Sequence, residues 1–68
     1  MRVVNRVKAL RTSAGMTQKA LAERVGVTAP CVCRWERGEM NPEIEKLFRL
    51  SAIFDVPIEQ IVQRTESA

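Results

Sequence analysis

Residues 17–38, TQKALAERVGVTAPCVCRWERG, decide the fold. Apolar residues recur within this stretch at three- and four-residue steps, which predicts two short helices, over residues 17–25 and 28–37. Gly26 separates them, because glycine accepts the positive φ that a sharp turn between helices requires. Two short helices joined by a tight turn are typical of a helix-turn-helix unit.

The same helical spacing continues on both sides of this stretch and predicts three more helices, over residues 2–14, 42–54 and 57–64. No stretch alternates with the two-residue period of a strand. The predicted fold is therefore all-α, a single compact domain of five helices over residues 1–68. The positions expected to point toward its core are Val3, Val7, Leu10, Ala14, Leu21, Ala22, Val25, Val32, Trp35, Ile44, Leu47, Leu50, Ser51 and Phe54.

Charge is divided unevenly along the chain. Residues 1–38 hold eight cations and two anions, whereas residues 39–68 hold three cations and six anions. A basic half joined to an acidic half favours one face that meets a polyanion and another that faces away.

Composition argues against several other functions. The chain has no histidine, no glycine-rich phosphate loop and no pair of carboxylates that the helices would bring together, so an enzyme is not expected. Two cysteines without histidine cannot complete a tetrahedral metal site, and no cofactor is expected. No apolar run is long enough for a membrane span, and the amphipathic start does not resemble a signal peptide, so a cytoplasmic location is expected.

The segment resembles the helix-turn-helix of the Cro and phage-repressor family, also called the xenobiotic-response-element family of bacterial regulators. The residues that carry the resemblance are Gln18, Leu21-Ala22, Val25-Gly26, Val32, Trp35 and Glu36-Arg37-Gly38, with Leu10-Arg11, Asn41-Pro42 and the DVPIEQIV stretch of residues 55–62 outside the segment. The resemblance covers about residues 3–62. It implies that residues 28–37 enter the major groove of double-stranded DNA.

Carried over by position, the resemblance assigns these residues to DNA: Thr17, Gln18, Thr28, Ala29, Pro30, Cys33, Arg34 and Arg37. Arg34 is the main candidate for base reading, because a guanidinium can bind guanine O6 and N7 together. Gln18, Thr28 and Arg37 are expected at phosphates. Ala29 and Pro30 cannot read a hydrogen-bond pattern, so they are expected at a thymine methyl group.

The resemblance also implies an ion pair between Arg11 and Glu36 that fixes the third helix against the first. Family members pair across a twofold axis on a palindromic site, so a homodimer is expected. Ile58, Ile61 and Val62 are candidates either for the dimer contact or for closing the core of the single chain.

Two questions stay open at this level. Cys31 and Cys33 point in different directions from one helix, so they are either small space-filling residues or thiols whose oxidation would weaken DNA binding. The leading function is that of a sequence-specific transcription regulator, a repressor that binds a palindromic operator as a homodimer. The alternative is an antitoxin-like or co-regulator module that uses the same fold to bind a protein partner.

Overall fold

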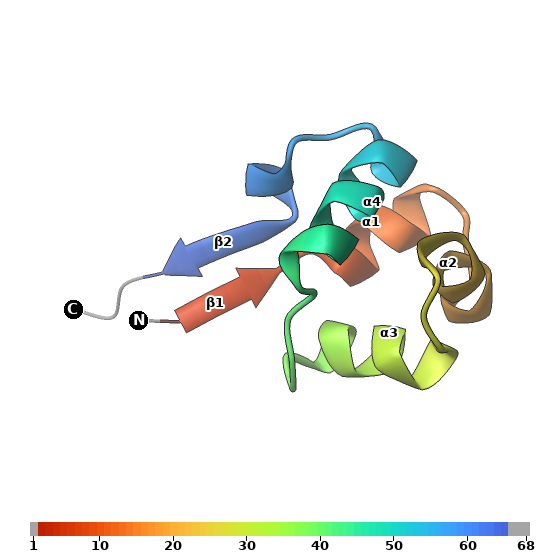
Figure 1. Ribbon diagram of the computed structural model, residues 1–68. Coiled ribbons are helices and arrows are strands. Elements are labelled where there is room, and N and C mark those ends of the chain that lie inside the picture. The colour runs from red at the N-terminus through yellow and green to blue at the C-terminus, as the bar shows by residue number, and fades with distance from the viewer. Residues whose placement is uncertain (1, 66–68) are drawn as a thin grey trace.

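The computed structural model describes residues 2–65, and the side-chain surroundings of residues 5–62. Its elements are β1 (Arg2–Asn5), α1 (Val7–Ser13), α2 (Gln18–Val25), α3 (Ala29–Arg37), α4 (Ile44–Phe54), the 3₁₀ turn η1 (Ile58–Gln60) and β2 (Val62–Thr65). The four α-helices form one body, and the two strands lie side by side at one end of it, close to both chain ends (Figure 1).

The expected five helices and the absence of a sheet are wrong at both ends of the chain. Residues 2–5 pair antiparallel with residues 62–65, with Val4 opposite Gln63 and Asn5 opposite Val62. The helix expected over residues 57–64 is a single 3₁₀ turn followed by a strand. Valine favours an extended backbone over a helical one, and this preference prevails where a second strand supplies the hydrogen bonds.

The core lies where the four helices and the turn before β2 meet. Its buried apolar side chains are Val7, Leu21, Ala22, Val25, Val32, Trp35, Leu47, Leu50 and Ile61. Two of the expected core residues are instead exposed, Ala14 and Ile44, and Leu10, Ser51 and Phe54 are half-buried. Because Leu47 and Leu50 centre the buried face of α4, Ile44 lies about a quarter turn to one side of it.

Local contacts fix the ends of α2 and α3. The Thr17 hydroxyl accepts a hydrogen bond from the Ala20 N–H at 3.0 Å, and the Thr28 hydroxyl accepts one from the Cys31 N–H at 3.3 Å. Gly26 ends α2 at φ 89°. These contacts set where α3 begins, and therefore which of its side chains face outward.

Gly26→Ala is expected to destabilise the protein more than Gly38→Ala. Both glycines have positive φ, 89° and 77°, so a side chain at either costs about 1–2 kcal/mol. A Cβ at Gly26 also lies 3.2 Å from Nη1 of Arg49, whereas a Cβ at Gly38 meets nothing within 4 Å. Chemical denaturation of the two variants measures the difference, and equal losses would contradict it.

Candidate nucleic-acid interface

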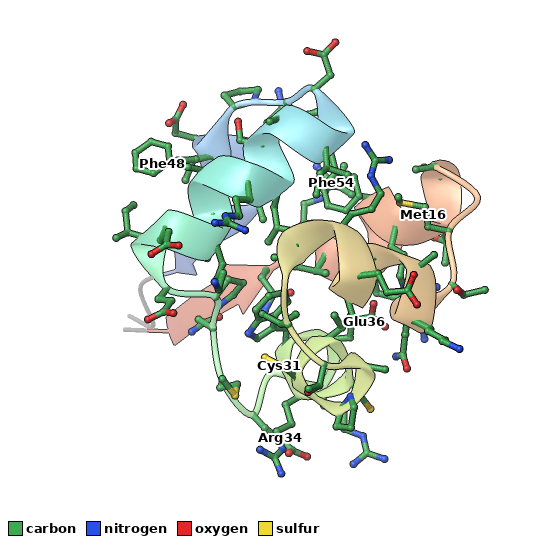
Figure 2. All side chains as sticks on the ribbon, turned by 45° about the vertical axis from the view of Figure 1, so that its right-hand side comes forward. Met16, Cys31, Arg34, Glu36, Phe48 and Phe54 are labelled. Atoms are coloured by element: carbon green, nitrogen blue, oxygen red, sulfur yellow. The ribbon has the colours of Figure 1, made fainter. Side chains whose placement is uncertain are left out.

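Helix α3 has one buried side and one exposed side. Val32 and Trp35 face the core, with Trp35 only 1% exposed, whereas Pro30, Arg34 and Arg37 are exposed. Figure 2 shows Arg34 on the outer side of α3, pointing away from the other helices. The exposed side is therefore free to meet a ligand, while the buried side holds the helix in place.

The structure divides the residues expected at DNA into two groups. Thr17, Thr28, Pro30, Arg34 and Arg37 are exposed, and Gln18, Ala29 and Cys33 are half-buried. Ala29 packs against the core, so it presents less surface than an outward position would. At the leading end of α3, Pro30 is consequently the more exposed apolar residue.

Arg11 and Glu36 lie together, as the resemblance implies. Nε of Arg11 donates to Oε2 of Glu36 at 2.6 Å, and Nη2 donates to Oε1 at 3.2 Å. The side chains of this pair are 12% and 5% exposed. Nη1 of Arg11 also donates to the Met16 carbonyl at 2.8 Å, so one guanidinium connects α1, the loop after it and the end of α3.

Gln18 belongs to the same network. Its Nε2 donates to Oε1 of Glu36 at 3.0 Å, a contact that the sequence did not indicate. This contact fixes the amide at the start of α2 and leaves its second N–H and its oxygen for another partner. The Gln18 side chain, which is expected at a phosphate, is therefore held in position by Glu36 at the end of α3.

The network shifts the pKa of both charged groups. Burial by itself would raise the pKa of Glu36, but hydrogen bonds from Arg11 and Gln18 and the charge of Arg11 outweigh it, so this pKa lies below its ordinary value of 4.5. The hydrogen bond to Glu36 raises the pKa of Arg11. The pair is therefore ionised at neutral pH.

Two further contacts hold α3 and were not expected from the sequence. Nδ2 of Asn5 donates to the Trp35 carbonyl at 2.8 Å, which ties the end of β1 to the last turn of α3. Nη1 of Arg49 donates to the Val25 carbonyl at 3.1 Å, which ties α4 to the end of α2, just before the turn to α3. Both partners are backbone carbonyls, whose availability depends on the fold and is not visible in a sequence pattern.

The surface around α2 and α3 is basic. Among residues 17–39, the exposed charged residues are the cations Lys19, Arg24, Arg34 and Arg37 and the anions Glu23 and Glu39. The carboxylate of Glu36 is occupied by Arg11 and Gln18. A polyanion approaching α3 therefore meets a surplus of positive charge.

The remaining candidates lie elsewhere. Ile61 is fully buried in the core of the single chain, which leaves it no surface for a partner, while Ile58 and Val62 are half-buried against that core.

Cys31 lines a shallow pocket of about 250 Å³ with Trp35 and Met40. Within residues 5–62, whose side chains the structure describes, no three acidic or cysteine side chains gather as they would around a metal ion.

In the described part of the chain, every helix is too short or too polar to cross a membrane.

Comparison with known proteins agrees with this arrangement. The helix-turn-helix family HTH_3 matches residues 7–61. An uncharacterized HTH-type transcriptional regulator of Archaeoglobus fulgidus is 36% identical over 56 residues, which are 82% of this chain and 79% of that protein. The HTH-type transcriptional activator BcrR of Enterococcus faecalis is 33% identical over 61 residues, 90% of this chain but 30% of the activator.

A solved structure shares both the fold and part of the sequence. The P22 c2 repressor, crystallised with a synthetic operator, superposes with a TM-score of 0.74 at 32% identity, over 78% of this chain and 80% of the repressor. The family is one of transcription regulators and not of enzymes. The chain belongs to the Cro/C1-type helix-turn-helix family of DNA-binding transcription regulators.

Proposed function

We propose that the chain is a repressor that binds a palindromic operator as a homodimer, with α3 of each copy in the major groove. The observation that carries this proposal is the exposed side of α3, which presents Arg34 to solvent while Val32 and Trp35 anchor the helix. The similarity to the P22 c2 repressor, a protein solved in complex with a synthetic operator, supports the repressor role.

Arg34 supplies base recognition in this proposal. Its side chain is exposed and lies on the outer surface of α3. A guanidinium presents two parallel N–H donors that match O6 and N7 of guanine, and no other base offers this pair of acceptors in the major groove. Arg34 therefore selects guanine.

The neighbouring positions orient the helix on the DNA backbone. The Thr17 and Thr28 hydroxyl oxygens accept from backbone N–H groups, so their own hydrogens are free to be donated to phosphates. Gln18 offers its second amide N–H beside the start of α2. Arg37, whose nearest carboxylate is Glu39 at 3.6 Å, exchanges this exposed partner for a phosphate at little cost.

Three more residues expected at DNA are apolar or weakly polar, and they fit the shape of the major groove without hydrogen bonds to it: Ala29, Pro30 and Cys33. In the proposed complex Pro30 contacts a thymine methyl group, and Ala29 and Cys33 pack beside it. Hydrogen-bond reading then falls mainly to Arg34, and the rest of the specificity comes from methyl contacts and from the deformability of the operator.

Affinity for the DNA upstream of the chain's own gene is expected to fall steeply with salt. A protein that contacts several phosphates releases counterions, so each contact lowers the log–log slope of affinity against salt by about 0.9. Fluorescence anisotropy with a labelled promoter duplex at several salt concentrations measures this slope. A flat response, together with tight binding to a protein partner, would instead favour the antitoxin-like or co-regulator function.

A further inference from the structure

The side-chain amide of Asn5, the half-buried last residue of β1, contacts three separate parts of the chain. Its Nδ2 donates to the Trp35 carbonyl at 2.8 Å and to Oδ1 of Asn41, in the loop between α3 and α4, at 3.3 Å. Its Oδ1 accepts from the Val7 N–H at 3.3 Å. The amide nitrogen and the amide oxygen therefore both have partners within the chain.

Two of these partners are helix ends of opposite polarity. Val7 is the first residue of α1, whose N-cap residue supplies no side-chain hydrogen bond, so its N–H needs an acceptor. The Trp35 carbonyl lies in the last turn of α3, where carbonyl groups need donors. Asparagine carries a donor and an acceptor on separate atoms of one short side chain, so Asn5 satisfies both helix ends at once.

The backbone around Asn5 is fixed to the core. Asn5 lies opposite Val62 in the antiparallel pair of strands. The N–H of the next residue, Arg6, donates to the Ile61 carbonyl at 2.8 Å, and the Ile61 side chain is fully buried. The amide of Asn5 therefore reaches α3 from a base that the core holds in place.

We propose that Asn5 is a positioning residue for DNA recognition, whose amide holds the last turn of α3 and thereby sets where Arg34 lies on the bases. The proposal rests on the proposed function, because it requires that α3 reads DNA. The carbonyl that Asn5 holds belongs to Trp35, the residue directly after Arg34. A bidentate contact with guanine requires two N–H donors to be aligned at the same time, so a small shift of this turn weakens it.

The Asn5 contact constrains α3 differently from the ion pair with Arg11. Arg11 holds α3 through the side chain of Glu36 and connects it to α1. Asn5 instead holds the backbone of α3 and connects it to the sheet. Because the ion pair and the buried Trp35 remain when the Asn5 contact is lost, the expected consequence is a loosened helix end in a folded chain.

Asn5→Asp separates the two roles of the amide. The carboxylate keeps an oxygen for the Val7 N–H, but it has no donor and places a second acceptor against the Trp35 carbonyl. Affinity for the operator recovered by selection from random DNA should fall about 10-fold. Affinity for an unrelated duplex should fall only about twofold, because phosphate contacts tolerate a small displacement better than a base contact does.

Asn41→Asp is the matched control. It places the same charge on the exposed neighbour of Asn5 and keeps an oxygen that accepts from Nδ2 of Asn5. It should therefore change both affinities alike and leave their ratio unchanged. Asn5→Ser is a neutral second variant, since its hydroxyl is too short to reach the Trp35 carbonyl, and it should lower the ratio in the same direction if Asn5→Asp does not fold.

Hydrogen exchange of the free protein, followed by NMR, tests the positioning without DNA. The Gly38 N–H donates to the Trp35 carbonyl at 3.1 Å and the Glu39 N–H donates to the Arg34 carbonyl at 3.0 Å, so both amides report on the last turn of α3. In Asn5→Asp both should exchange about 10-fold faster, while the Gly26 N–H at the end of α2 keeps its rate. A general loss of stability would instead speed exchange at the core amides of every helix.

A lower ratio of operator to unrelated affinity in Asn5→Asp but not in Asn41→Asp, with faster exchange confined to the end of α3, would support the proposal. Unchanged exchange at Gly38 and Glu39 in a folded Asn5→Asp chain would overturn it, whether or not the chain binds DNA, and so would an unchanged affinity ratio. A wild type that binds every duplex alike would refute the proposed function, and the exchange rates would then decide separately whether Asn5 holds the end of α3.

Discussion

The Glu36→Ala chain is expected to lose about 3 kcal/mol of unfolding free energy, because its Arg11 guanidinium would stay buried without a carboxylate partner. Arg11 is 12% exposed and Glu36 is 5% exposed, so water replaces the lost partner poorly. Gln18 would lose its acceptor at the same time. A domain of this size has a small margin of stability, and a loss of this size unfolds a substantial fraction of the molecules.

Thermal and urea denaturation of Glu36→Ala beside Glu39→Ala measures this effect. Glu39 is the matched control, because its carboxylate is 53% exposed and 3.6 Å from an arginine that is 68% exposed. Removing such an exposed pair should change the unfolding free energy by about 0.5 kcal/mol or less. Equal effects of the two substitutions would show that the Arg11–Glu36 pair does not brace α3.

The same pair makes stability depend on pH in a defined direction. Because the pKa of Glu36 in the folded chain lies below its ordinary value of 4.5, the unfolded chain binds the proton more readily. The contribution of the pair to the free energy of unfolding is complete at pH values above the ordinary pKa of Glu36. It is lost as the pH falls through the lower pKa that Glu36 has in the folded chain. Glu36→Gln should therefore differ from wild type most at neutral pH, and the difference should shrink in acid.

The Arg34→Ala chain is expected to lose sequence discrimination while remaining folded. Arg34 is exposed, so its removal leaves the core intact. The lost guanine contact should weaken binding to the operator by about 1–3 kcal/mol, roughly 5- to 150-fold. Binding to unrelated DNA, which depends on phosphate contacts, should fall far less.

Competition binding with operator and unrelated duplexes measures the ratio of the two affinities. Arg37→Ala is the matched control on the same helix, since a phosphate contact at Arg37 predicts that both affinities fall together. Gln18→Ala should likewise weaken both alike. A specificity ratio that Arg34→Ala leaves unchanged would exclude Arg34 as the base-reading residue.

Much of the helical body could be predicted from the sequence, since its local signals agree with one another. Thr17 and Thr28 begin α2 and α3, and Gly26 and Gly38 end them. The buried side of α3, with Val32 and Trp35, follows from helical spacing. In this part of the chain, local propensity, capping and burial all favour the same structure.

The errors occur where distant residues decide the outcome. The spacing of Val3 and Val7 is compatible with a helix, but the partner strand, residues 62–65 near the other end of the chain, favours extended backbone for residues 2–5. The exposure of Ile44 depends on the rotation of α4, which Leu47 and Leu50 set. The Gln18 contact with Glu36 likewise requires the crossing of α2 and α3, so residue types alone do not reveal it.

Selection of bound duplexes from a random DNA pool tests most directly the claim that α3 of this chain reads DNA. The result expected for wild type is a twofold-symmetric consensus with a guanine at one position of each half-site, and loss of the preference at that position with Arg34→Ala. A pool without a shared sequence, or a consensus that Arg34→Ala leaves intact at every position, would contradict it.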